Sequence, residues 1–219
     1  MNAMSDPNLS SYLLVAQTLL FLGAWAVLDR RVKKHGPIPG MQRVTLIHNR
    51  IYALLSLILL VFIASPAHEQ TARYLFHASK FYEYLDILSV CAKGATINLH
   101  FGFHHLSTPY FTFFRVLQHS QGWQLIAAMN ALHHVLMYAY FGGAGFIRPL
   151  LDVTGSAQLI GGLGGDLWIL GRKMQAGNDA IWPNLFGIGL FSIYLVLWVR
   201  EIRTRDREHT APPSKVKDL

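Results

Sequence analysis

The sequence contains little cysteine and little charge. The single cysteine among 219 residues, Cys91, lies in an apolar run, which excludes a disulfide framework and a cysteine-based metal site. Charged residues make up only 14% of the chain, whereas a typical soluble domain contains about 25%. Because 52% of the residues are hydrophobic, the composition predicts one domain that lies in a membrane.

The net charge is +7, yet the positions of the charges do not indicate a nucleic-acid-binding surface. Basic residues concentrate at 30–43 and 200–217, between or after apolar runs. Basic segments beside membrane spans face the cytosol. We therefore expect cytosolic membrane flanks and no nucleic-acid partner.

Apolar segments long enough to cross a bilayer recur along the chain. The first is followed by Asp29-Arg30-Arg31 rather than preceded by basic residues, so we interpret it as a retained helix and not as a cleaved signal peptide. An N-terminal segment without Lys or Arg and a basic C-terminus agree with an odd number of spans. We predict seven spans, at 10–28, 46–64, 74–92, 96–114, 123–141, 150–170 and 183–199.

These spans predict an all-α polytopic membrane protein in three parts. Residues 1–9 form a short luminal N-terminus, residues 10–203 a single seven-helix domain, and residues 204–219 a basic cytosolic tail. Lys215 and Lys217 are spaced like a dilysine retrieval signal of the endoplasmic reticulum, and a frayed basic tail is the alternative interpretation.

The third predicted span contains the ionisable residues Lys80, Glu83 and Asp86. An ionisable side chain at bilayer depth costs several kcal/mol unless it is paired or hydrated. Residues three apart are neighbours on a helix, so Lys80 can pair with Glu83, and Glu83 and Asp86 form a polar strip. Snorkelling charges at a helix end are the alternative, and they suit Asp86 least.

Two histidine clusters follow on adjacent spans. His100 and His104 share a helix face at i and i+4, while His105 points about 100° away from His104. The second cluster has four residues on one helix face, which are Asn130, His134, Met137 and Tyr138. His133 lies to one side of this face. A single buried histidine is usually a hydrogen-bonded core residue. Five imidazoles beside an acidic strip instead indicate one reaction centre inside the membrane.

Three hypotheses fit this centre. A neutral imidazole can attack a thioester and hold the acyl group, while a neighbouring histidine acts as base or hydrogen-bond donor. Alternatively, His-x-x-x-His-His is similar to the histidine boxes of di-iron desaturases and hydroxylases. Those enzymes use about eight histidines in three boxes, and the remaining histidines here form no further box. A transporter or scaffold is the third hypothesis, and no sequence feature supports it.

The motifs resemble those of the ELO family of very-long-chain fatty acid elongases, which are 3-ketoacyl-CoA synthases. Four of them occur in family order within about residues 49–200. They are Lys80 to Asp86, similar to Lys-x-x-Glu-x-x-Asp; His100 to His105, similar to His-x-x-His-His; Asn130 to Tyr140, which matches Asn-x-x-x-His-x-x-Met-Tyr-x-Tyr; and Thr154 to Gln158, a loose counterpart of Thr-x-x-Gln.

The chain also departs from the family pattern. His100 stands one position early in its box, where Phe101 occupies the family position. Ile87 follows the acidic motif where the family usually has Thr, and His133 is additional. The spacing from Thr154 to Gln158 is one residue longer. The role of His100 is therefore open.

The resemblance implies a protein of the endoplasmic reticulum membrane with a luminal N-terminus and a cytosolic C-terminus. Six helices would surround a narrow tunnel, and the first helix would pack outside. The implied reaction condenses long-chain acyl-CoA with malonyl-CoA to 3-ketoacyl-CoA, CO2 and CoA, without a metal or cofactor. Membrane lipid and the other enzymes of the elongation cycle are the implied partners, and a homodimer is left open.

The resemblance also implies roles for the motif residues. His104 would carry the acyl group, and His134 would activate or steer the malonyl unit. CoA would enter near Lys93, Arg148 or the 30–43 loop, and the tunnel would end at Trp168 or at 111–114. His105 and His100 complete the predicted catalytic set, with His105 as a hydrogen-bonding neighbour of His104. The supporting residues are Asn130 and Tyr138 as hydrogen-bonding groups, Lys80, Glu83 and Asp86 as charges that tune the imidazoles, and His133 and Met137 beside them.

Overall fold

The computed structural model describes residues 7–118, 121–178 and 180–210. All regular elements in these ranges are helical. The first six residues of the predicted luminal N-terminus, and the two C-terminal lysines of the predicted retrieval signal, lie outside the described ranges. The helices are α1 (Pro7–His35), α2 (Met41–Ala64), η2 (Pro66–His68), α3 (Glu69–Tyr82), α4 (Tyr84–Ala92), α5 (Leu99–Phe111), the π-helical η3 (Thr112–Leu117), α6 (Trp123–Phe141), η4 (Gly145–Ile147), α7 (Arg148–Gln175) and α8 (Trp182–Thr210).

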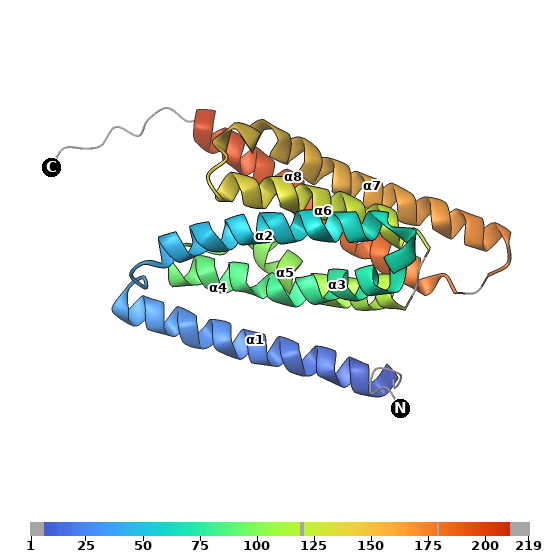
Figure 1. Ribbon diagram of the computed structural model, residues 1–219, viewed down its shortest axis with the longest axis horizontal. Coiled ribbons are helices and arrows are strands. Elements are labelled where there is room, and N and C mark those ends of the chain that lie inside the picture. Colours follow the sequence, from blue (N-terminus) through green and yellow to red (C-terminus); the bar gives the residue numbers. More distant parts are fainter. Residues whose placement is uncertain (1–6, 119–120, 179, 211–219) are drawn as a thin grey trace.

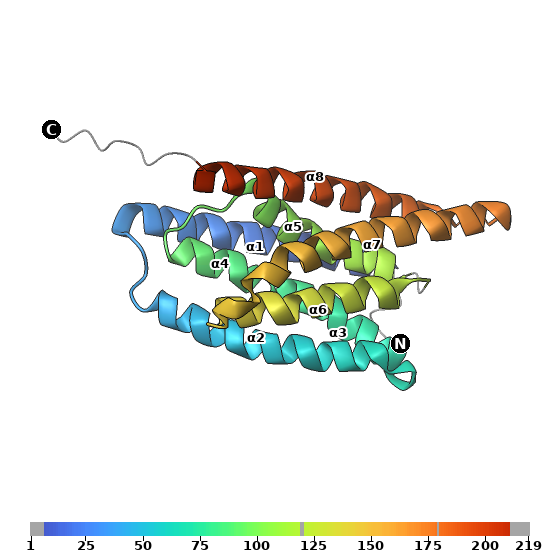
Figure 2. The same ribbon diagram turned by 90° about the horizontal axis from the view of Figure 1, so that it is seen from above.

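The helices form seven rods, six of which close into a ring. α3 and α4 follow one another along one rod, as do α5 and η3. Around the ring, α2 packs on α6, α6 on α7, α7 on α8, α8 on α5, α5 on α3 and α4, and these on α2. α1 lies outside the ring against α4 (Figure 1). The view from above shows the rods running nearly side by side (Figure 2).

Among the described residues, three helices are long and apolar enough to cross a membrane, by length and composition. They are the segments Tyr12–His35, Met41–Ala64 and Trp182–Arg205, with mean hydropathies of 1.6, 2.0 and 1.7. The third predicted span is interrupted at Glu83, and the fourth contains Pro109 and ends in a π-helix. α8 continues to Thr210, past the predicted boundary of the domain at residue 203. The structure thus confirms an all-helical chain with apolar spans.

The basic end of the bundle is the end at which α1 finishes with Lys33, Lys34 and His35. The connections at this end are short and specific. Gly40 begins α2 with a φ of 79°, a left-handed conformation that favours glycine. The backbone N–H of Ile38 donates to the carbonyl of Ala92, 2.9 Å away, which ties this loop to the end of α4. Asn98 caps α5 by accepting a hydrogen bond from the backbone N–H of Phe101 at 2.7 Å. These contacts fix where α5 and its histidines begin.

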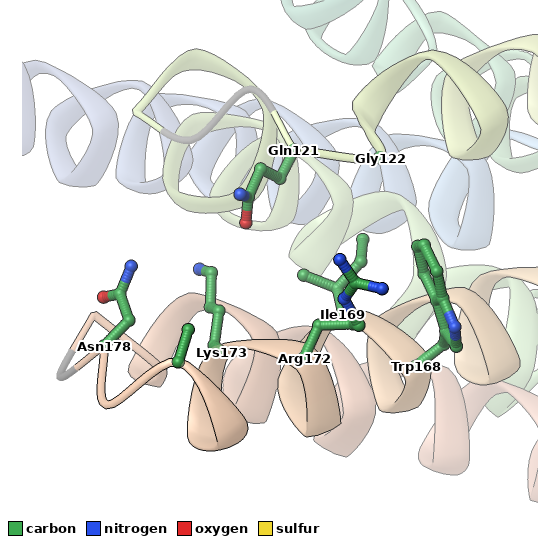
Figure 3. Close-up of a pocket in the computed structure, with 8 residues that line it drawn as sticks. Gln121, Gly122, Trp168, Ile169, Arg172, Lys173 and Asn178 are labelled. Atoms are coloured by element: carbon green, nitrogen blue, oxygen red, sulfur yellow. The ribbon is translucent and has the colours of Figure 1, made fainter.

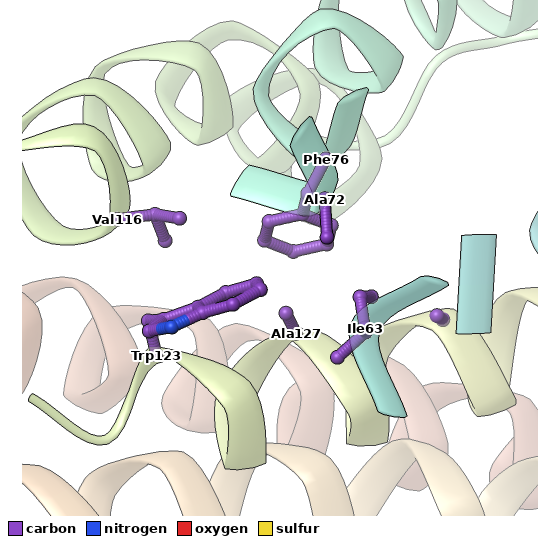
Figure 4. Close-up of a cluster of buried hydrophobic side chains, with 7 residues drawn as sticks. Ile63, Ala72, Phe76, Val116, Trp123 and Ala127 are labelled. Carbon is purple, nitrogen blue, oxygen red and sulfur yellow. The ribbon is translucent and has the colours of Figure 1, made fainter. Parts of the chain in front are cut away.

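A hydrophobic cluster closes the opposite end of the ring. It joins α2, α3, η3 and α6, and Trp123 and Phe76 are its largest buried side chains (Figure 4). Its other buried members are Ile63, Ala72, Val116, Ala127 and Ala131. The interior therefore opens towards the basic end rather than towards this one.

Glycines allow α7 and α8 to approach closely. A Cβ atom at Gly162 would overlap the ring of Phe191, and one at Gly155 would lie 2.6 Å from the ring of Trp198. Small residues commonly permit such contacts between membrane helices. The glycine-rich sequence of α7 thus lets two aromatic rings of α8 point into the ring of helices.

Candidate active site

A cavity of about 400 Å³ opens between α5, α6, α7 and α8. All five histidines of the two predicted clusters line it, as does Met137. The remaining lining residues come mostly from the ends of α6, α7 and α8 near the basic end of the bundle. They are Phe101, Tyr140, Phe141, Arg148, Leu151, Asp152, Gly155, Gln158, Leu159, Trp198, Glu201 and Arg205.

His104 separates this cavity from a smaller inner one. It lines both, together with Gln158 and Leu159. The inner cavity has a volume of about 30 Å³ and is bordered on its apolar side by Phe111 and Phe191. A chain that passed the imidazole would therefore run directly towards these two phenylalanine rings.

The imidazole of His104 is held by aromatic contacts. Its ring centroid lies 4.9 Å from that of Tyr194 and 5.5 Å from that of His105. The buried Nδ1 atoms of His104 and His105 find no hydrogen-bond partner among the described residues. Neither imidazole is thus committed to a partner through Nδ1.

The predicted pair of Lys80 and Glu83 forms in the interior. The ammonium group of Lys80 lies 2.5 Å from Oε1 of Glu83 and 2.7 Å from Oδ1 of Asn130. Both charged side chains are almost fully buried, at 2% and 0% exposure. The hydroxyl of Tyr52 on α2 donates to the same Glu83 oxygen at 3.2 Å. A buried charge needs such partners, because losing one costs several kcal/mol.

The carboxylate of Asp86 has partners of its own and makes no side-chain hydrogen bond to Glu83 among the described residues. Its Oδ1 lies 3.0 Å from Nε2 of His48 on α2, and its Oδ2 accepts a short hydrogen bond from the hydroxyl of Tyr138. The hydroxyl of Tyr82 lies 3.2 Å from the other ring nitrogen of His48. Asp86 is therefore an internal link between α4, α2 and α6 rather than a snorkelling charge.

His134 has a polar group beside each ring nitrogen. Nδ1 lies 3.3 Å from Oε1 of Glu83 in an ion-pair contact, and Nε2 accepts a hydrogen bond from the amide of Asn130 at 3.4 Å, which leaves the proton of a neutral ring on Nδ1. The Asn130 amide also donates to Gln158 at 3.1 Å. This arrangement fixes the orientation and the tautomer of His134. His133, the additional histidine, instead bonds Thr154 through Nδ1 at 2.9 Å.

His100 points away from the interior network. Its Nδ1 lies 2.7 Å from Oε2 of Glu201 on α8, and its ring centroid lies 6.1 Å from that of His104. The early position of His100 in its box thus corresponds to a contact with a different helix.

Charged groups surround the mouth of the cavity. Asp152 accepts from Arg148 at 3.0 Å and from Arg205 at 2.7 Å. The hydrogen bond that Arg148 donates to Asp152 raises the pKa of the Arg148 guanidinium above its ordinary value. One carboxylate thus holds two arginines beside the opening, while Lys93 and the 30–43 loop do not line it.

Several residues at the site were not predicted from their own sequence context. His48 and Tyr52 share a face of α2 at i and i+4, and this spacing is the signal that could have indicated them. Tyr194, Glu201 and Arg205 lie in a segment that was interpreted only as a span and its flank. The loose fourth motif does reach the site, because Thr154 and Gln158 bond His133 and Asn130.

A separate pocket of about 380 Å³ lies at the opposite end of α7 (Figure 3). Trp168 and Arg172 line it, with the guanidinium 5.8 Å from the tryptophan ring. Trp168 is 67% exposed and does not line the cavities beside His104. The aromatic boundary of the inner cavity instead includes Phe111, from one of the two predicted alternatives, together with Phe76, Phe191 and Tyr194.

The histidines do not converge as a metal-binding group. Within residues 7–118, 121–178 and 180–210, no set of three or more His, Cys, Asp or Glu side chains is arranged to hold a metal ion. Their nitrogens instead bond Glu83, Thr154 and Glu201 on separate sides of the cavity. This geometry gives the di-iron hypothesis no support.

Comparison with known families adds a decisive observation. Residues 64–160 match the family model described as ELO: GNS1/SUR4 family. The resemblance to the ELO family is confirmed. The matched segment runs from the end of α2 to the middle of α7 and contains all four motifs. At the level of the family, this supports a membrane-associated enzyme of fatty acid elongation. No curated protein matches the chain.

Proposed function

We propose that the protein condenses a long-chain acyl-CoA with malonyl-CoA to give 3-ketoacyl-CoA, CO2 and CoA, through an acyl group held on His104. The observation that carries this proposal is the position of His104 between the outer and inner cavities. The thioester can then approach from the outer cavity while its alkyl chain extends past the imidazole.

The hydrogen bonds favour His104 over His134 as the nucleophile. Nε2 of His134 is hydrogen-bonded to Asn130, and Nδ1 faces the carboxylate of Glu83 at 3.3 Å. No ring nitrogen of His104 makes a hydrogen bond within the described part of the chain, so its lone pair is available for attack on a carbonyl carbon. The attack forms a nitrogen–carbon bond, and the carbon–sulfur bond to CoA breaks.

The second half-reaction assigns the fixed imidazole of His134 to malonyl-CoA. Loss of CO2 leaves a carbanion at the thioester α-carbon, which attacks the acyl carbonyl and releases His104. His134 and the Asn130 amide lie on the helix beside the first cluster, and an amide hydrogen of Asn130 that turns from Gln158 to the thioester oxygen can steady its negative charge. The buried pair of Lys80 and Glu83 holds both groups in place.

The charges at the mouth suit the phosphates of CoA. Arg148 and Arg205 line the outer cavity, and arginine binds phosphate through paired donors. Their shared partner Asp152 keeps the two guanidinium groups together in the absence of substrate. Of the three predicted entry points, Arg148 is the one that the geometry supports.

The proposal includes a membrane location. The C-terminal ends of α1 and α8, both rich in basic residues, lie at the same end of the bundle (Figure 1), and Arg205 near that end of α8 lines the outer cavity. Since basic flanks face the cytosol, CoA would enter from the cytosol, and the C-terminus would lie on that side. Residence in the endoplasmic reticulum, membrane lipid as surroundings, and contact with later enzymes of the cycle belong to the same proposal.

The test is intact mass of the full-length protein in detergent after incubation with a panel of acyl-CoAs. The wild type is expected to gain one acyl group, and His104→Ala none. His134→Ala is expected to retain acylation but to lose malonyl-CoA-dependent formation of 3-ketoacyl-CoA. The matched control is His68→Ala, an exposed histidine on η2 at the far end of the bundle.

Two results would contradict the proposal. Acylation of His104→Ala to the wild-type extent would remove the nucleophile assignment. Stoichiometric iron in the purified protein, with turnover that requires oxygen and a reductant, would replace condensation by the di-iron hypothesis.

A further inference from the structure

His100 has a carboxylate partner on a helix far along the chain. Its Nδ1 lies 2.7 Å from Oε2 of Glu201, which is 101 residues away in sequence. A ring nitrogen at this distance from a carboxylate donates its proton to it. The contact therefore fixes the orientation of the ring and keeps a proton on Nδ1, so that Nε2 is the nitrogen available for proton exchange.

The surroundings hold this pair at the mouth of the outer cavity. The ring of Trp198 lies 5.5 Å from that of His100, and the Asn98 cap anchors the first turn of α5 below it. The side chains of His100 and Glu201 are 16% and 32% exposed. The pair thus borders both the cavity and the solvent, which can supply a proton.

His100 lies on the path of the leaving group. It is one helical turn from His104 on the same face of α5, towards the cavity mouth, and their ring centroids are 6.1 Å apart. Both rings line the outer cavity. CoA that leaves the carbonyl at His104 towards the mouth would carry its sulfur past His100.

Among the other charges near the mouth, Arg205 stands one turn after Glu201 on α8 and attracts its carboxylate, but the guanidinium hydrogen-bonds Asp152 of α7. The carboxylate of Glu201 makes its ion pair with His100. The nearest imidazole is that of His104, which is the proposed nucleophile. Glu201 can therefore balance the positive charge of a protonated His100.

Building on the proposed function, we infer that His100, held by Glu201, is the catalytic acid that protonates the departing CoA thiolate. The lone pair of His104 attacks the thioester carbon, the carbon–sulfur bond breaks, and the Nε2 proton of the His100 imidazolium moves to sulfur. CoA leaves as the neutral thiol, His100 becomes neutral, and the positive charge remains on the acyl-imidazolium of His104. Solvent at the mouth then reprotonates His100.

The test compares two leaving groups in His100→Gln. The rate of acyl-enzyme formation is measured by rapid quenching and intact mass of the full-length protein, with an acyl-CoA and with the 4-nitrothiophenyl thioester of the same acid. The nitrothiophenolate leaves without a proton, whereas the CoA thiolate gains from one. General acid catalysis contributes about 10²–10⁴-fold, so we expect a loss of that order with acyl-CoA and little change with the activated thioester.

A second variant and a control complete the experiment. Glu201→Gln keeps an acceptor for Nδ1 but removes the charge, so it is expected to show a smaller loss with acyl-CoA and again little change with the activated thioester. It also provides the test if His100→Gln does not fold. His68→Gln, with an exposed histidine, is expected to behave as the wild type with both substrates.

The outcomes separate this inference from the proposed function. An equal loss with both thioesters would make His100 a structural residue, and an undiminished rate with acyl-CoA would remove it from the step; either result overturns the inference alone. A wild type that is acylated by neither thioester would overturn the proposed function and the inference with it.

Discussion

Substitution of Phe191 by Ala tests whether the inner cavity receives the acyl chain. Phe191 is 6% exposed, and its ring meets that of Phe111 edge to face at a centroid distance of 5.1 Å. The cavity that these rings border holds about 30 Å³, which is about the share of one water molecule in the liquid. An alkyl chain that reaches the rings of Phe111 and Phe191 must therefore end there or push the rings aside.

The magnitude follows from the burial of methylene groups. Each buried methylene contributes about 0.8 kcal/mol. Because a tenfold change in rate corresponds to about 1.4 kcal/mol, this contribution is a factor of about four in kcat/KM. We expect kcat/KM of the wild type to rise by about this factor for each added carbon until the chain reaches the two rings. Phe191→Ala removes six ring carbons, so this limit should move to chains longer by up to roughly six carbons in a close-packed interior.

The assay is kcat/KM for malonyl-CoA-dependent condensation over a series of saturated acyl-CoAs. Removal of a buried phenylalanine also costs about 3–5 kcal/mol of stability, so thermal unfolding in detergent is recorded in parallel. Phe186→Ala is the matched control, because Phe186 packs against the same cluster on α8 but does not line the inner cavity. Gly162→Ala should act in the opposite direction, since its methyl group would push the Phe191 ring away from α7.

An unchanged length optimum in Phe191→Ala would refute this reasoning, because the acyl chain would then not reach the ring. An equal shift in Phe186→Ala would refute it as well, because general loosening of α8 would account for both results.

Three further predictions concern stability and metal dependence. Arg115→Met should destabilise the protein by about 3–5 kcal/mol in detergent unfolding, because it leaves the fully buried Asp166 without the guanidinium that now lies 2.5 Å away. The double variant with Asp166→Leu should recover most of the lost stability. No recovery in the double variant would contradict an ion-pair origin of the loss. Lys80→Met should lower the free energy of unfolding by a similar amount, because it removes the ammonium group that pairs with the carboxylate of Glu83. A loss below about 1 kcal/mol, typical of an exposed pair, would show that this carboxylate is hydrated. Incubation with a strong chelator should leave condensation unchanged, and inactivation that added iron or zinc reverses would contradict the metal-free proposal.

Local spacing predicted those parts of the site that lie on one helix. Lys80 and Glu83 pair as their three-residue separation indicates, and His100 and His104 share a face of α5. The Asn130 and His134 contact also follows from an i, i+4 spacing. Such pairs depend only on the helical repeat, which the sequence carries directly.

Helical spacing does not predict which side chains meet between different helices. The partners of Asp86 come from α2 and α6, and that of His100 comes from the end of α8. No periodicity relates residues that are 38, 52 or 101 positions apart. They meet because the six rods close into a ring, which brings α2 beside α6 and α5 beside α8.

The sequence by itself determined an apolar, helical chain with a basic end, two histidine clusters and an acidic motif, and the order of these motifs led to the ELO family. Hydropathy, charge position and helical spacing are local properties, so no coordinates were needed for them. Only the tertiary structure decided that His104 stands between two cavities, that His134 lies between Glu83 and Asn130, and that His100 faces Glu201. These depend on which helices pack together, and close packing of small and aromatic side chains between α7 and α8 sets that arrangement.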